Sequence, residues 1–433
     1  MTGPAAALIR RVLPGLLFVL LLLPAGAQGT LRGEYAITGT GYLSGSDGYT
    51  SSLNPGNLAN LKDLSFQHRL STRVSAGEGT AFLDLLIDLT PLAEPLSGGV
   101  SPELFNLALM RGAVSWYMGD GFKITLGRQS LLTGYGYGWN PLDLANPLKD
   151  PVDPEAELAG VDGVTVHLLP GSSLNLKLYG IADPEVSGAG VDYETISLGG
   201  EASLVGAGTE LKVTGLYRFD GEENLDGPTA GLGAGIFTDI GGAGFYAEAS
   251  LRNRSRTLFI QPGGVLETKA GPVWSALGGA EYTFPGGLFV TAEYYYNGEG
   301  YNREEREDIL SALEDPSLLE ALGSFDQDIA AGAAAEFAAL TEPYRPGCYS
   351  RHYGLVSLVY PLYDQNMDLS GTLLYSFDAG TLALQPRIIW YASGGLTLEA
   401  AYGGLFDLTG DEAGEAALAP VKHAVSLTGR FSF

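Results

Sequence analysis

The chain has 433 residues and a formal net charge of −26 at pH 7, from 50 acidic and 24 basic residues. Such an acidic balance argues against nucleic acid as a partner and against electrostatic attachment to an anionic membrane surface. Glycine (62 residues) is abundant, and tyrosine (23) outnumbers phenylalanine (17), which suits twisted strands with aromatic girdles. The single cysteine, Cys348, excludes a disulfide framework, and we expect a lone thiol in a loop.

The first 27 residues have the order of a secretory signal peptide. Arg10 and Arg11 precede an apolar run over 12–23, and Ala25-Gly26-Ala27 then predicts cleavage before Gln28. The apolar run is shorter than the roughly 20 residues of a spanning helix, which disfavours a membrane anchor. No Pro/Ser-rich linker divides the rest, so we expect 28–433 to form one domain.

Segments of about ten residues with alternating apolar and polar character recur along the remaining chain. Examples are 64–74, 81–89, 122–126, 174–178, 211–217, 245–251 and 288–296. In the first, Leu64, Phe66, Leu70 and Val74 oppose Gln67, Arg69 and Arg73; in the second, the leucines oppose Asp84 and Asp88. A period of two predicts strands with one apolar face. Each strand alone is compatible with a soluble or a membrane barrel.

The connections between these segments favour the membrane barrel. We count about eighteen strands, and the connections alternate between short and long. Short turns are expected at 75–79, 118–121, 169–173, 206–209, 240–243, 284–287, 361–366 and 392–395. Longer connections are expected at 44–63, 90–104, 131–160, 182–192, 220–228, 252–272, 298–351 and 407–419. Only the connection 377–381 is short at a position where the alternation calls for a long one. This pattern predicts an all-β, antiparallel transmembrane barrel of 16–18 strands with periplasmic turns and extracellular loops.

The connection over 298–351 has helical signals. Residues 302–314 are highly charged, and 330–340 are mostly alanine. Between them, Pro316 and a Ser317-x-x-Glu320 capping box mark another helix start. We expect a partly helical extracellular loop, which either caps a pore or is a solvated, variable excursion.

The last fourteen residues form an amphipathic strand that stops on an aromatic residue. Val425, Leu427, Phe431 and Phe433 alternate with polar side chains. This strand resembles the closing strand of bacterial outer-membrane barrels, and the resemblance implies that Phe433 is part of the signal for the barrel assembly machinery.

A second resemblance lies between strands. Gly127-Arg128-Gln129, followed by the Gly/aromatic stretch 135–139 and Asn140-Pro141-Leu142-Asp143, resembles a stretch of large porin-like barrels, including those of alginate-export type. The resemblance implies a passive diffusion barrel in the outer membrane, with the loop 131–160 near its constriction.

The residues of that loop support the same site. Asp143, Asp150 and Asp153 would face the polar strand residues Arg69, Arg73 and Lys123 if the loop folded inward, with Arg128 nearby. Opposed charges across a narrow channel select solutes by charge, and the loop acids predict weak cation selectivity. In the alternative, the loop stays outside and the arginines pair with lumenal acids such as Asp84 and Asp88.

Motifs for catalysis are not apparent. The four histidines do not lie at metal-ligand spacing from one another, and no nucleophile, Walker or dinucleotide motif is present. His68 and His423 fall on the apolar register of their strands, which predicts packing at the membrane interface. We therefore expect no enzyme, no cofactor and no metal.

The sequence favours a porin-like channel for passive diffusion of small or oligomeric hydrophilic solutes. Its expected partners are outer-membrane lipids, the assembly machinery and the solute, and a homo-oligomer stays open. The alternative is a non-conducting surface protein, an adhesin or structural barrel that binds an extracellular partner through 298–351. An outer-membrane enzyme is a third reading.

Overall fold

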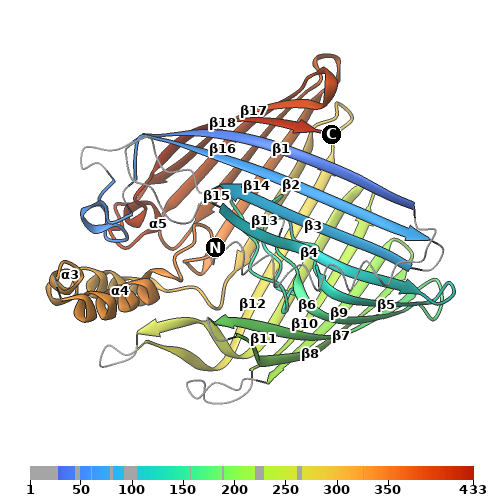
Figure 1. Cartoon of the computed structure of the whole chain (residues 1–433), viewed down its shortest axis with the longest axis horizontal. Coiled ribbons are helices and arrows are strands. Elements are labelled where there is room, and N and C mark those ends of the chain that lie inside the picture. Colours follow the sequence, from blue (N-terminus) through green and yellow to red (C-terminus); the bar gives the residue numbers. More distant parts are fainter. Residues whose placement is uncertain are drawn as a thin grey trace, which may run out of the picture.

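The computed structural model describes residues 28–43, 49–59, 61–78, 81–91, 105–156, 158–187, 190–219, 229–260, 266–324 and 326–433. The predicted signal peptide, residues 1–27, lies outside these residues and stays a prediction. The described strands form one closed barrel, with helices gathered at one of its ends (Figure 1).

Eighteen strands make up the barrel, and they pair antiparallel with their neighbours in chain order. They are β1 Gln28–Leu43, β2 Leu64–Glu78, β3 Ala81–Pro91, β4 Phe105–Tyr117, β5 Phe122–Gln129, β6 Val161–Leu168, β7 Leu174–Ser187, β8 Gly190–Gly206, β9 Thr209–Phe219, β10 Thr229–Ile240, β11 Ala243–Ile260, β12 Leu266–Thr283, β13 Phe289–Tyr296, β14 His352–Leu362, β15 Met367–Ser376, β16 Thr381–Tyr391, β17 Leu396–Asp407 and β18 His423–Ser432.

The sheet closes because β1 pairs with both β2 and β18. Beyond β18, Phe433 exchanges two backbone hydrogen bonds of 2.9 Å with Gly33 and so extends the seam. Closure removes the exposed edges of the sheet. The predicted all-β antiparallel barrel is confirmed, at the upper end of the expected strand number.

The connections alternate as the sequence predicts, which gives the barrel a turn end and a loop end. The turns between β8 and β9 and between β10 and β11 have only two residues, whereas 130–160 and 297–351 are long. In Figure 1 the helices lie at the loop end and the C-terminus at the turn end.

Two expected long connections are mostly strand, and this part of the prediction is wrong. β7 and β8 continue through most of 182–192, and β11 and β12 continue through most of 252–272. Register shifts occur after Asp183, Arg252 and Arg254. Such bulges let pairing continue through polar sequence that does not keep a strict period of two.

The apolar strand faces point outward. Leu232 and Leu427 are 67% and 64% exposed, whereas Thr428, on the other face, is 8% exposed. In β2, Leu64 and Phe66 are exposed, as expected for an outer wall. A lipid-facing apolar surface and a polar interior are the arrangement of a transmembrane barrel.

The histidines predicted at the interface lie on this outer wall. His68 Nδ1 is hydrogen-bonded to the hydroxyl of Tyr35 at 2.8 Å, and His423 Nδ1 to that of Tyr402 at 2.8 Å. Both belong to the outward register of β2 and β18. Amphipathic rings suit the level of the lipid head groups, so this prediction agrees with the structure.

The loop 297–351 contains the three expected helices. α2 (Arg303–Leu313) begins with a capping box between Asn302 and Glu305, α3 spans Pro316–Leu322, and α4 spans Gln327–Thr341. The predicted Ser317 capping box is wrong. Asp315 is the N-cap of α3, because its side chain accepts from the Ser317 amide at 2.7 Å.

The connection between β17 and β18 carries one further short helix, α5 (Glu415–Leu418). Across the ranges given above, no helix has the length and apolar character needed to cross a membrane.

Candidate functional site

The loop 130–160, between β5 and β6, lies inside the barrel against its wall. Glu248, on the inward face of β11, accepts hydrogen bonds from the amides of Tyr135, Gly136 and Leu142. The last two measure 3.1 and 3.3 Å. A single buried carboxylate therefore holds three backbone amides of the loop.

A second buried carboxylate, Glu293 of β13, holds the next two residues. It accepts from the amides of Tyr137 and Gly138, the latter at 2.8 Å, and from the hydroxyl of Tyr246 at 2.7 Å. Glu248 and Glu293 together form a latch of two wall carboxylates under residues 135–142.

Apolar packing completes this attachment. The ring of Trp139 stacks on that of Tyr295, with centroids 5.0 Å apart. Leu142 is fully buried, and it lies over Gly233 and Gly235 of β10, where an added Cβ would stand 2.7 Å from its methyl groups. Glycine at these two inward positions leaves the space that the loop fills.

The far part of the loop reaches another section of the wall. Asp153 accepts from Arg387 of β16 at 3.3 Å, and Arg387 also pairs with Glu399 of β17 at 3.2 Å. Glu399 in turn pairs with Arg430 of β18 at 2.7 Å. The loop therefore lies within the lumen between β11 and β16, and the alternative of a loop outside the barrel does not fit.

The loop acids have other roles than the sequence suggested. Asp143 is 8% exposed and accepts from the amide and side chain of Asn146 at 3.0 and 2.7 Å. Burial raises the pKa of its carboxyl, and it stabilises a turn of its own loop. Asp150 is exposed and accepts from the Val152 amide at 2.9 Å. Asp143 and Asp153 are thus held by Asn146 and Arg387, and the expected weak cation selectivity stays a prediction.

The predicted wall residues lie on two strands, β2 and β5. The residues of β1 that pair in register with Arg69 and Arg73 lie on the same face of β1 as Glu34. The Glu34 side chain points inward and pairs with Arg430, so Arg69 and Arg73 also lie on the inward face of β2. Lys123 lies over the ring of Tyr117, 5.5 Å from its centroid.

Three further candidates complete the predicted set. Arg128 pairs with Asp162 of β6, at 2.5 and 2.9 Å. Asp84 and Asp88 belong to β3, but their side chains lie outside the described part of the structure. The base that meets the loop acids is Arg387, which the sequence argument did not name.

Glu248 and Glu293 were also missed. Each interrupts a run of small and aromatic residues, in Ala247-Glu248-Ala249 and Ala292-Glu293-Tyr294. A lone acid in the middle of a strand is the only available signal. Only the fold shows which loop that acid meets.

Two cavities flank the loop. The first, of about 380 Å³, lies between the loop and the wall and is lined by Arg218, Arg252 and Arg256. We call it the basic recess. The second, of about 260 Å³, is lined by loop residue Asp150 and by wall residues that include Gln385 and Thr372.

Three loops interlock inside the barrel at Gly347. Its carbonyl accepts from Trp139 Nε1 at 2.8 Å, and its amide donates to Glu415 of α5 at 2.8 Å. The neighbouring Cys348 is a free thiol, as expected, and desolvation raises its pKa to about 12. The inner loop, the helical loop and the α5 connection therefore share one junction.

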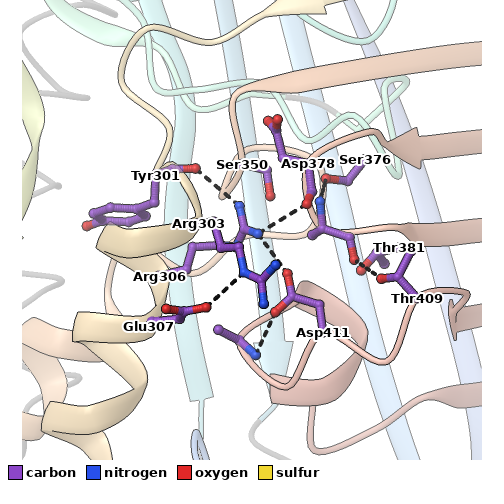
Figure 2. Close-up of polar contacts among 12 residues, drawn as sticks. Tyr301, Arg303, Arg306, Glu307, Ser350, Ser376, Asp378, Thr381, Thr409 and Asp411 are labelled. Atoms are coloured by element: carbon purple, nitrogen blue, oxygen red, sulfur yellow. Dashed lines mark hydrogen bonds and ion pairs between the residues drawn. The ribbon is translucent and has the colours of Figure 1, made fainter.

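A second junction ties the helical loop to its neighbours further out, and Figure 2 shows it. Arg306 of α2 is fully buried and donates to the carboxylate of Asp411 at 2.7 Å and to the carbonyls of Asp378 and Tyr301 at 3.2 and 3.4 Å. One guanidinium thus joins α2 to the connections that follow β15 and β17.

Comparison with known proteins identifies the fold. No family model matches the sequence, and no curated protein does. Among solved structures, the chain is similar to OccK8 (OprE) of Pseudomonas aeruginosa, with 9% identity and a TM-score of 0.52 over 94% of this chain and 98% of that one. OccK2 (OpdF) of the same organism gives 11% and 0.51 over 95% and 98%. OccAB2 of Acinetobacter baumannii gives 10% and 0.50 over 94% and 98%.

Identities this low bear on the fold alone, and the finer resemblance to alginate-export-type barrels stays a prediction. Together with the closed eighteen-stranded sheet, the matches show that this chain has the fold of a porin-like outer-membrane β-barrel.

Proposed function

We propose that this protein is an outer-membrane channel for the passive diffusion of small hydrophilic solutes. The observation that carries the proposal is the loop 130–160, which lies in the lumen and has a cavity on each side. A closed barrel with an inward-folded loop provides a path through a membrane and narrows it.

In this proposal the loop forms the constriction, and its Asp150 faces the path. Arg69, Arg73 and Lys123 supply positive charge to the wall away from the loop, and Asp84 and Asp88 would supply negative charge. A signal peptide directs export, Phe433 takes part in recognition by the assembly machinery, and the outer wall contacts lipid.

One observation favours the rival function. The loops that meet at Gly347 and at Arg306 fill part of the loop end, as an obstructed barrel would require. In that case α2, α3 and α4 would serve as a rigid surface for an extracellular partner, and the barrel would not conduct.

Solute passage separates the two functions. Folded protein is reconstituted into liposomes, and swelling is followed in uncharged sugars of increasing size. The channel proposal predicts fast swelling with monosaccharides, slower swelling with larger sugars, and a higher size limit after deletion of 134–156. Swelling no faster than that of protein-free liposomes, for both proteins, would support the non-conducting alternative.

A further inference from the structure

The outer wall of the barrel carries an apolar groove across the four neighbouring strands β12 to β15. The groove has a volume of about 540 Å³ and lies in the half of the wall nearer the loop end. Four small residues form its floor: Gly278 and Ala280 of β12, Ala292 of β13 and Gly354 of β14. They face outward, because Gly278 and Gly354 pair in register with Tyr294, which is 48% exposed.

The open floor at Gly278 contrasts with other outward glycines of the wall. An added Cβ at Gly278 would meet no atom within 4 Å. At Gly200 of β8 and Gly215 of β9, an added Cβ would meet a leucine methyl group at 3.0 and 3.2 Å. Leucines therefore cover those two glycines, whereas the groove stays open. Since it is continuous with the lipid-facing wall, the molecule that reaches it there is a membrane lipid.

Aromatic rings border the groove on its loop-end side. The ring centroids of Tyr294 and Phe377 are 6.1 Å apart, and those of Tyr375 and Phe377 are 5.0 Å apart. All three side chains line the groove. Aromatic residues form girdles at the boundary between hydrocarbon and lipid head groups. The rings therefore mark the level at which the acyl chain of a lipid in the groove ends and its head group begins.

Two polar groups lie at this boundary. His352 Nδ1 is 2.6 Å from the hydroxyl of Tyr294, and when that hydroxyl donates, the hydrogen of the imidazole is on Nε2. Asp378 is exposed, and its carboxylate accepts from the amides of Arg351 and His352 at 3.0 and 2.8 Å. This end of the groove thus offers one N–H donor and one negative charge.

We propose that the groove binds one acyl chain of a zwitterionic glycerophospholipid, with the head group at His352 and Asp378. The lipid phosphate accepts from His352 Nε2, and the head-group ammonium faces the Asp378 carboxylate. The neighbouring cation, Arg351, is paired with Glu305 at 3.0 Å, so a net anionic lipid is repelled by Asp378. This inference goes beyond the proposed function, because the site belongs to the outer wall and does not depend on conduction.

Lipid retention by the full barrel tests the site. Folded protein in detergent is stripped of lipid, incubated with phosphatidylethanolamine, phosphatidylglycerol or lipid A, and analysed by native mass spectrometry. The proposal predicts saturable retention of one phosphatidylethanolamine per barrel and several-fold lower retention of either anionic lipid. No retained lipid, or stronger retention of an anionic lipid, would overturn it.

Variants that fill the groove locate the lipid. Gly278→Leu and Ala292→Leu place apolar side chains in the groove, which a lipid-facing wall tolerates, and each should reduce retention several-fold. Ala202 of β8 is a matched control, because it pairs with the outward-facing Val213 and lies away from the groove. Ala202→Leu should change retention less than twofold. Heat-modifiable mobility on gels verifies that each variant is folded.

Two further variants test the head-group contacts. His352→Phe keeps a ring at the boundary without the N–H donor and should weaken retention several-fold. Asp378→Asn keeps an acceptor for the two amides but removes the charge, so the preference for phosphatidylethanolamine over phosphatidylglycerol should disappear. Equal retention by the Ala292 and Ala202 variants, or an unchanged lipid preference in Asp378→Asn, would overturn the proposal.

Discussion

Removing the latch carboxylates should free the inner loop. In the variant Glu248→Ala, three backbone amides of the loop lose their acceptor, and Glu293→Ala removes the acceptor of two more. A hydrogen bond to a charged group contributes about 1.5–3 kcal/mol. Water in the lumen can replace part of that, so we expect each substitution to weaken the attachment of the loop by roughly 2–4 kcal/mol.

The weakened attachment has a measurable consequence. A loss of about 3 kcal/mol raises the detached population of the loop on the order of a hundredfold, since about 1.4 kcal/mol corresponds to a factor of ten. Each single variant should then show current fluctuations in a planar bilayer that the wild type lacks. The double variant should fluctuate more and have a higher mean conductance.

A matched control separates the latch from the loss of a wall charge. Glu281 belongs to the inward register of β12 near the turn end, away from the loop. Glu281→Ala removes the same charge and should leave the current as quiet as in the wild type. Quiet currents of unchanged size in both latch variants would refute the role of Glu248 and Glu293, as would equal noise in the Glu281 control.

Three other predictions test the wall, the seam and the outer junction. Leu427→Arg should lower the free energy of unfolding in liposomes by about 2–4 kcal/mol because Leu427 faces lipid, whereas Ser426→Arg on the inward face should cost much less; equal penalties in urea titration would contradict the face assignment. Deleting Phe433 should reduce the heat-modifiable, folded barrel in the outer membrane, because the seam loses two hydrogen bonds and, in our proposal, the chain loses part of its assembly signal; normal yield would count against both roles. Arg306→Met leaves Asp411 without its ion-pair partner and should destabilise the outer junction by about 3–5 kcal/mol. Proteolysis of the helical loop should then be faster in an otherwise intact barrel, and an unchanged cleavage rate would contradict the role of this junction.

The wall of the barrel is predictable from the sequence because its physics is local. Alternation along 64–74 places Leu64 and Phe66 on one face and Arg69 and Arg73 on the other, and pairing in the sheet keeps those faces. Turn positions follow from short glycine-rich connections such as Gly241-Gly242. The hairpin ends near 182–192 were not predictable, because bulges there break the period of two.

The interior is less predictable because its contacts join residues that are far apart in the chain. The sequence identified the loop 131–160 and its acids, but Asp143 is bound by a neighbour three residues away and Asp153 by Arg387. Glu248 contacts amides more than a hundred residues before it. No periodic pattern encodes such a pairing; it appears only when the barrel closes around the loop.

Single-channel recording in a planar bilayer tests the central claim, that the inner loop narrows a conducting barrel. Wild-type protein should insert in discrete, uniform current steps, and deletion of 134–156 should give larger steps because that segment occupies the lumen. Absence of current steps from folded protein would contradict the channel. Steps of the same size with and without the segment would contradict its role as the constriction.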